Sequence, residues 1–199
     1  MNNRHIRIAL VLAAFLTGLV ISLGAILIVS GRLSTASGPQ AAAIGGAFRL
    51  IDQDGRTVTD QDLKGEPSLV FFGFTHCPDI CPTTLFDISE VMHALGPDAD
   101  RAHAVFITVD PERDTQPALK DYLSSFDPHL AGLTGGLDAI TAVAKEYRVY
   151  FKKVPLDNGD YTMDHTAIVY LMDKQGRFVS PFSLKRPPEA SAAELRRYL

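Results

Sequence analysis

The chain has two cysteines, Cys77 and Cys81, and the segments on either side of them constrain its fold more than any other feature. Residues 68–74 are almost all apolar and rich in β-forming side chains, which predicts a central strand covered on both faces. Pro82 favours the first position of a helix and keeps the residue before it out of helical geometry. We therefore predict a buried strand, a turn that carries Cys77, and a helix with Cys81 at its N-cap.

Further segments of strand and helix alternate along the rest of the chain. Apolar residues at helical spacing predict helices over 83–95, 118–126, 137–147 and 190–198. Extended patterns predict a hairpin of 48–52 with 57–59, a second central strand over 104–109, an edge strand near 149–151, and a final hairpin of 166–172 with 177–182. This order predicts an α/β fold in which helices flank a mixed sheet. Because no glycine-rich phosphate loop follows any strand, nucleotide binding has no support in the sequence.

Near the N-terminus, an uncharged run dominated by Leu, Ile, Val and Ala occupies residues 8–30. As a helix it would be about 34 Å long, enough to cross the roughly 30 Å hydrocarbon core of a bilayer. The arginines within residues 1–7 favour a short cytoplasmic tail, with the rest of the chain on the other side of the membrane. A cleaved signal peptide is the alternative. Its apolar region usually has about 7–15 residues, so we expect an uncleaved transmembrane anchor instead.

Residues 31–46 are mostly small, which indicates a flexible tether between this anchor and one domain of ordinary size, residues 47–199. All 23 acidic residues lie in that domain, and the whole chain has a net charge of −4. An acidic domain argues against nucleic acid as a partner. We expect the domain to be a monomer.

The cysteine pair can form a disulfide, hold a soft metal ion, or alternate between the two. Outside the cytoplasm a disulfide would persist, but a loop this short would add little to the stability of a domain. The free N–H groups and the dipole at the start of the helix should lower the pKa of both thiols, and thiolates bind metals and attack disulfides. The alternative is that Cys77 and Cys81 are only small apolar residues of the core.

His165 is the best candidate for a third ligand. It directly precedes a predicted apolar strand, and in an α/β sandwich the loop before one central strand can approach the loop after another. The other histidines are weaker candidates: His5, His76, His93, His103 and His129. Of these, His76 is next to Cys77 and could be a ligand or could tune the thiols. Two thiolates and one imidazole suit Cu(I), and they accept Cu(II) with one more oxygen or nitrogen ligand. A closed zinc site would need four protein ligands.

Two carboxylates and a thioether near this predicted site could add to it. Asp110 ends the predicted strand 104–109, and Asp164 is the neighbour of His165. Either could be a fourth ligand or a group that orients the histidine. Met163 is a conceivable soft ligand, but a packing role suits it better.

Three motifs, in residues 72–82, 109–115 and 164–171, resemble those of the Sco (SCO1/SenC) family. The resemblance extends over residues 47–199 and implies a thioredoxin-like fold that faces the periplasm or the mitochondrial intermembrane space. Because the N-terminus lacks a clear mitochondrial transit peptide, we expect a single-pass protein of a bacterial inner membrane, with its C-terminal domain in the periplasm.

The same resemblance implies a function and a set of ligands. It implies that Cys77, Cys81 and His165 bind copper. The implied role is that of a metallochaperone rather than an enzyme, which helps to load the binuclear copper site of cytochrome c oxidase subunit II or of another copper acceptor. Family members are also discussed as thiol–disulfide reductases that keep the cysteines of the acceptor reduced.

Three other classes of protein remain open on the residues alone. In a thiol–disulfide oxidoreductase Cys77 would be the nucleophile, but such enzymes usually have two residues between their cysteines and a cis-proline facing them, where this chain has residues 164–166. A peroxidase of the peroxiredoxin kind has a threonine three positions before its cysteine, whereas Thr75 lies two before. A purely structural module would leave the two cysteines and the histidine unexplained.

Overall fold

The computed structural model describes residues 12–13, 15–22, 44–157 and 159–199. The chain divides into two compact units, residues 1–42 and 43–199. Residues 12–13 and 15–22 are helical, whereas most of the expected anchor at 8–30 and of the tether at 31–46 lies outside the described residues. Within the described residues, no helix has both the length and the apolar character that crossing a bilayer requires.

The second unit is built on a mixed sheet of seven strands in the order β2-β1-β5-β4-β3-β8-β9. In chain order the strands are β1 (Arg49–Asp52), β2 (Thr57–Thr59), β3 (Ser68–Gly73), β4 (His103–Thr108), β5 (Leu130–Thr134), β8 (Val169–Met172) and β9 (Phe178–Pro181). Strands β3, β4 and β5 are parallel, and the remaining pairs are antiparallel. The predicted mixed sheet is therefore confirmed, as are its opening and closing hairpins.

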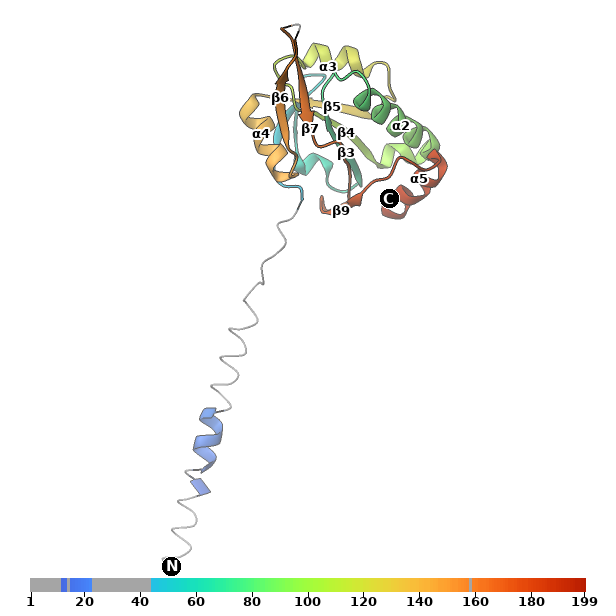
Figure 1. Cartoon of the computed structure of the whole chain (residues 1–199). Helices are drawn as coiled ribbons and strands as arrows, with labels where there is room; N and C mark the ends of the chain where they lie inside the picture. Colours follow the sequence, from blue (N-terminus) through green and yellow to red (C-terminus); the bar gives the residue numbers. More distant parts are fainter. Residues whose placement is uncertain (1–11, 14, 23–43, 158) are drawn as a thin grey trace, which may run out of the picture. The chain divides into compact units, whose positions relative to one another are not determined.

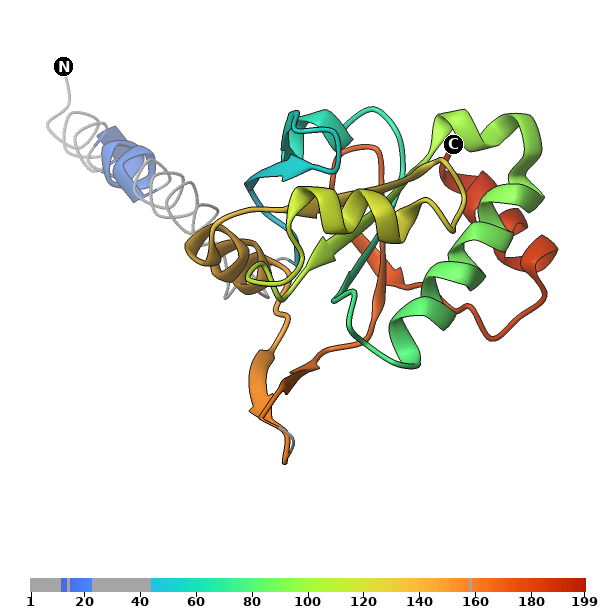
Figure 2. The ribbon, with the colours of Figure 1, turned by 90° about the horizontal axis from the view of Figure 1, so that it is seen from above.

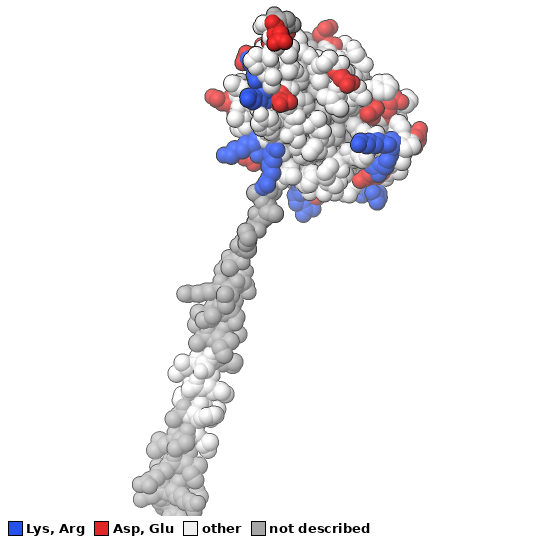
Figure 3. Space-filling model, viewed as in Figure 1, with Lys and Arg blue, Asp and Glu red and all other residues white. Residues whose placement is uncertain are grey.

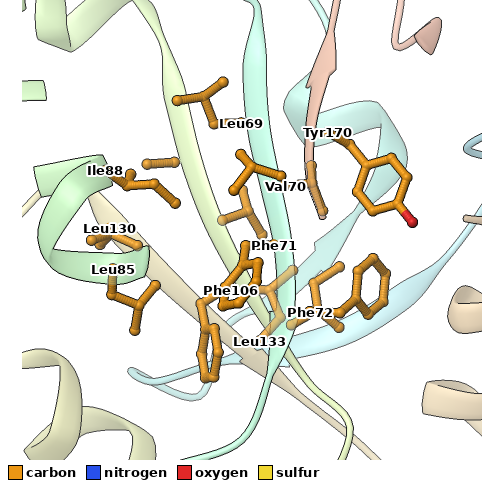
Figure 4. Close-up of a cluster of buried hydrophobic side chains, with 14 of the residues drawn as sticks. Leu69, Val70, Phe71, Phe72, Leu85, Ile88, Phe106, Leu130, Leu133 and Tyr170 are labelled. Atoms are coloured by element: carbon orange, nitrogen blue, oxygen red, sulfur yellow. The ribbon is translucent and has the colours of Figure 1, made fainter. Parts of the chain in front are cut away.

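Strand β3 lies at the centre of the core, and all six of its residues are buried. Its side chains alternate between the two faces of the sheet, as the pleat of a strand requires. Figure 4 shows Leu85 and Ile88 on one side of β3 and Phe72 and Tyr170 on the other. Each face has its own helical cover, and for this reason the strand is apolar at every position rather than at every second one.

Four helices cover the sheet: α2 (Ile80–Leu95), α3 (Gln116–Leu123), α4 (Leu137–Glu146) and α5 (Pro188–Leu195). Helices α2 and α5 pack together on one face, and α4 lies on the other (Figures 1 and 2). Helix α3 packs on β5, where Gly132 makes room for Leu123 of the helix; a Cβ atom at Gly132 would lie 2.4 Å from a Leu123 methyl carbon.

Helix α2 begins two residues earlier than predicted, at Ile80 instead of Pro82, and its N-cap is Asp79 rather than Cys81. Pro82 is therefore the third helical residue. The first intrahelical bond of the usual spacing runs from the Thr83 amide to the Asp79 carbonyl, at 3.2 Å. A proline is tolerated here because the first amides of a helix have no partner within it. A proline is tolerated at any position of the first turn, so Pro82 alone does not fix the residue at which the helix begins. For this reason the predicted start lies two residues too late.

Three strands were not predicted at their observed positions: β5, β6 (Phe151–Pro155) and β7 (Tyr161–His165). Strand β5 contains Ala131 and Gly132, which have low β-propensity, and only its place between β1 and β4 makes it a strand. Strands β6 and β7 pair with one another in a separate two-stranded sheet. This hairpin extends away from the rest of the domain (Figure 2). Figure 3 shows acidic side chains at its tip, and charges of both signs scattered over the visible face of the domain.

Candidate metal centre

Cys77 lies in the turn that follows β3, and Cys81 lies in the first turn of α2. The amide of Cys77 donates to the Phe74 carbonyl at 3.3 Å, which closes the turn after the strand. The amide of Cys81, which is free at the start of the helix, donates to Cys77 Sγ at 3.4 Å. Both thiols are free, with Cys77 partly exposed and Cys81 completely buried. The start of the helix therefore orients the sulfur of Cys77 toward the amide of Cys81.

Gly73, the last residue of β3, provides the space that the Cys81 thiol occupies. A Cβ atom at this position would lie 2.8 Å from Cys81 Sγ and 2.7 Å from the ring of Phe106. Contacts this short do not occur between such atoms, so a side chain here would displace the thiol. The end of the strand and the first turn of the helix can approach one another only because residue 73 is glycine.

His165 comes from the opposite side of the site, at the end of β7. Its Nε2 atom lies 3.6 Å from Cys81 Sγ, which confirms that the segment before β8 approaches the turn after β3. Its Nδ1 atom lies 3.2 Å from the carbonyl oxygen of Thr166. The ring packs edge-on against Phe74, with 5.8 Å between centroids and an interplanar angle of 89°. Two residues 84 positions apart in sequence are thus in contact.

The carbonyl of Thr166 determines which nitrogen of His165 carries the proton. A carbonyl oxygen only accepts hydrogen bonds, so Nδ1–H is the donor and Nε2 keeps its lone pair on the side of Cys81. Burial lowers the pKa of His165, which favours this neutral ring. Neutral imidazole is the form that binds metals, so the ring is already prepared for a ligand role.

Burial raises the pKa of the Cys81 thiol well above its usual range. Our expectation that the helix start would favour a thiolate at this position was therefore wrong for Cys81. The reason is that a fully buried thiolate loses its hydration, and this cost exceeds the stabilisation by the helix dipole. A metal ion that binds here would displace the proton and supply the positive charge that the thiolate lacks.

The other predicted site residues lie in different surroundings. Asp110 is buried and accepts from the Arg113 guanidinium and the Tyr161 hydroxyl, whereas Asp164 is exposed on β7. The partner that orients His165 Nδ1 is thus a backbone carbonyl and not either of these carboxylates. Met163 is buried in the core. The ring of His76 bonds to the Thr75 hydroxyl at 3.0 Å.

Sequence reasoning missed Asp114, which is fully buried beside the cysteine turn. Its carboxylate accepts from the Thr75 amide at 3.0 Å and from the hydroxyls of Thr75 and Thr108, each at 2.6 Å. Burial raises the pKa of Asp114 despite these bonds. Its position inside the motif at residues 109–115 was the available signal, but nothing in the local pattern indicated a contact with residue 75.

In the described part of the chain, no three His, Cys, Asp or Glu side chains are already gathered as a metal site. The donors that do meet are the thiol of Cys81 and the imidazole of His165, with the sulfur of Cys77 beside the first helical turn. Two thiols and one imidazole form a soft donor set that fits copper better than a hard ion. The domain therefore falls in the class of α/β proteins that have two cysteines where a central strand leads into a helix, and a histidine in contact with one of them.

The comparisons with known proteins narrow this class to one family. The sequence model of SCO1/SenC matches residues 36–199, and the chain belongs to that family. An SCO2-like protein of Rickettsia conorii is 43% identical over 155 residues, which are 77% of this chain and 76% of the relative.

Solved structures of relatives carry copper. ScoI of Bradyrhizobium japonicum with copper bound is 66% identical, with a TM-score of 0.78 over 79% of this chain and 100% of the relative. Yeast Sco1 with copper bound is 36% identical, with a TM-score of 0.71 over 78% of this chain and 88% of the relative. Membership of the family and the thioredoxin-like arrangement are therefore established on both sequence and fold.

Proposed function

We propose that this protein is a membrane-anchored copper metallochaperone in which Cys77, Cys81 and His165 bind one copper ion. The observation that carries the proposal is the 3.6 Å contact between Cys81 Sγ and His165 Nε2. A buried thiol and a neutral imidazole meet there from distant parts of the chain, and the sulfur of Cys77 accepts a hydrogen bond from the Cys81 amide. The copper that is bound in the structures of relatives supports copper as the ion.

Three protein ligands suit an ion that is cargo and must leave again. A site with few ligands lets the thiolates of an acceptor enter the coordination shell and take the ion by exchange, whereas a closed four-ligand site would retain it. Cys77 is partly exposed, so the site can be approached from its side. The ion would thus pass to an acceptor by way of this cysteine.

We propose the binuclear copper site of cytochrome c oxidase subunit II as the acceptor, because assembly of that enzyme is the role of the family. We also propose that residues 8–30 anchor the protein in a bacterial inner membrane, with the domain in the periplasm. This location would put the domain in the compartment where such a copper site is assembled, and the tether at 31–46 would let the domain reach it.

Thiol–disulfide exchange is the second candidate function, and the neighbouring thiols favour it. Cys77, which is partly exposed, would attack a disulfide of the acceptor, and Cys81 would then displace the reduced acceptor from the mixed disulfide. The raised pKa of Cys81 argues against an efficient second step, because a thiol must lose its proton before it attacks. We therefore rank copper delivery first.

The decisive experiment measures copper stoichiometry in the reduced, full-length protein purified in detergent. We expect one Cu(I) per chain, and a loss or strong weakening of binding in Cys77→Ser and in His165→Ala. His93→Ala is the matched control, because His93 lies on the last turn of α2, far along the helix from the cysteines. A competition titration with a chromophoric Cu(I) chelator gives the affinities.

The outcomes separate the two functions. Equal affinity in the His165→Ala variant and the native protein would remove this residue from the site. A folded, fully reduced native protein that binds no copper would overturn the metallochaperone. The reduction potential of the cysteine pair would then be the next quantity to measure.

A further inference from the structure

The segment of residues 110–114, between β4 and α3, contacts both parts of the proposed copper site. On one side it holds the turn that carries Cys77, and on the other it holds the hairpin that carries His165. The cysteines follow β3 of the main sheet, whereas His165 ends β7, which pairs only with β6. The pairing of β8 with β3 brings the segment after His165 to the site, and the hairpin before it is held by contacts with residues 110–114.

Asp114 makes the contact with the cysteine turn. It accepts two hydrogen bonds from Thr75, which lies two residues before Cys77, and a third from Thr108 at the end of β4. The carbonyl of Asp114 accepts from the Thr134 hydroxyl of β5 at 2.9 Å. The C-terminal end of the segment is thus joined to the main sheet and to the turn that leads to the thiols.

Arg113 and Asp110 make the contact with the hairpin. Arg113 Nη1 donates to the Tyr161 carbonyl at 2.9 Å and lies 3.3 Å from the Asp160 carboxylate. Arg113 Nε donates to Asp110 at 2.5 Å, and the Tyr161 hydroxyl donates to the same carboxylate at 3.0 Å. Tyr161, the first residue of β7, is therefore bound twice: its backbone carbonyl by Arg113 and its hydroxyl by Asp110.

The guanidinium of Arg113 also fills the space between the two parts of the site. Its central carbon lies 3.7 Å from the centroid of the Tyr161 ring and 5.9 Å from that of Phe74. Phe74 is the same ring against which His165 packs. Arg113 thus stacks between the hairpin and the aromatic residue that supports the histidine ring.

One nitrogen of this guanidinium, Nη2, is buried and has no hydrogen-bond partner among the described residues. An unsatisfied buried donor costs free energy. An apolar side chain in its place would nevertheless leave the buried Asp110 carboxylate without its cation, so this position requires a positive charge for stability. The directed bonds to Asp110 and to β7 explain why the cation is an arginine, because only a planar fork of donors can make them together.

We propose that Arg113 is a positioning residue that holds β7, and thereby His165, at the distance from Cys81 that copper requires. The proposal rests on the copper site proposed above. Without the guanidinium, the hairpin would keep its internal pairing and the bond from the Tyr161 hydroxyl to Asp110, but it would lose the bond from Arg113 to the Tyr161 carbonyl. His165 would then spend less of its time beside Cys81, and copper would bind more weakly and with a less regular set of ligands.

The test compares the full-length native protein with Arg113→Met, which removes the fork of donors and keeps a long side chain. We expect the Kd for Cu(I) to rise about tenfold or more in a chelator competition. We also expect the sulfur-to-copper charge-transfer band of the Cu(II)-loaded variant to shift, which a loss of stability alone would not cause. Arg113→Lys keeps the charge without the fork, so its Kd for Cu(I) and its band position should lie between those of the native protein and of Arg113→Met.

Arg177→Met is the matched control, because Arg177 also bonds to a nearby carboxylate, that of Asp173, but does so in the turn between β8 and β9. Its Cu(I) affinity and Cu(II) spectrum should equal those of the native protein. An Arg113→Met variant with a Kd within twofold of the native value and an unchanged band would overturn the proposal. If Arg113→Met does not fold, the same two measurements on Arg113→Lys decide.

Amide hydrogen exchange in the copper-free protein keeps this test separate from the proposed function. We expect exchange at residues 161–165 to become about tenfold faster in Arg113→Met and to stay unchanged in Arg177→Met. A native protein that binds no copper would overturn the metallochaperone but not the positioning role. Unchanged exchange at these residues would overturn the positioning role, even if copper binds.

Discussion

At the scale of single residues, burial decides the chemistry of the site more than local sequence does. Cys81 and His165 both lose contact with water, and the effects on their pKa values run in opposite directions because one group is charged when deprotonated and the other when protonated. The result is a neutral pair, thiol and imidazole, in contact. Such a pair is stable without a metal ion and still able to release a proton when one arrives.

His129 permits a residue-scale prediction on pH. Its two ring nitrogens bond to the carboxylates of Asp127, at 2.6 Å, and Asp100, at 3.1 Å, and these bonds raise its pKa. Since the folded protein binds this proton more tightly than the unfolded chain does, the stabilisation is complete below pH 6.5 and is lost as the pH rises through the raised pKa.

We expect the native protein to lose more of its free energy of unfolding than His129→Gln does as the pH rises above 6.5, because only the native protein has this proton to lose. Urea denaturation of both proteins at a series of pH values measures the difference. His93→Gln is the control, because His93 is exposed in the last turn of α2. Parallel curves for the native protein and the His129→Gln variant would show that the two carboxylates contribute nothing through this proton.

At the scale of elements, the junction of β3 and α2 positions the thiols. The strand ends at Gly73 and the helix begins at Ile80, so the turn between them is short and closely packed. Cys81 occupies the space above the glycine. The proposed copper site therefore depends on the absence of a side chain in the strand as much as on the presence of two thiols.

The variant Gly73→Ala should disturb this junction. A methyl group would lie within 3 Å of Cys81 Sγ and the Phe106 ring, so one of them must move. We expect a loss of about 1–3 kcal/mol in the free energy of unfolding, as for other overpacked cores. We also expect weaker Cu(I) binding, because the displaced thiol no longer meets His165.

The control for this prediction is Gly136→Ala. A Cβ atom at Gly136 would have no neighbour within 4 Å, and the backbone there has a negative φ. Because Gly136 is the N-cap of α4, urea denaturation should show a loss of at most about 1 kcal/mol, and Cu(I) competition should match the native protein. If Gly73→Ala were equally close to native, the packing of Cys81 against the strand would be looser than the structure shows.

At the scale of the whole molecule, the core lies within the second unit. The buried apolar side chains of the described residues all fall between Phe48 and Leu195, and the seven-stranded sheet starts at Arg49. Such a unit carries its own hydrophobic core and has the size of an ordinary domain. We therefore expect a fragment of residues 44–199 to fold independently.

The check is a comparison of urea midpoints by circular dichroism, for this fragment and for the full-length protein in detergent. The two midpoints should agree within experimental error, and the fragment should unfold in one cooperative transition. A fragment that is unfolded, or much less stable than the full chain, would show that residues before 44 contribute to the stability of the domain.

The sequence by itself determined those parts of the protein that depend on near neighbours. The apolar run of β3, the turn with Cys77, and the helix that begins near Cys81 follow from local patterns and were predicted within a few residues. The mixed sheet followed from the order of elements, and three short motifs were enough to indicate the family. His165 could be singled out because it precedes an apolar strand.

The tertiary structure decided everything that depends on burial or on contacts between distant residues. It places His165 within 3.6 Å of Cys81, assigns the orientation of its ring to the Thr166 carbonyl, and raises the pKa of a thiol that the helix start was expected to lower. It also makes a strand of residues 130–134, which local propensity does not favour. The physical reason is the same in each case: desolvation, packing and hydrogen bonding across 84 residues of chain leave no mark in the local pattern of side chains.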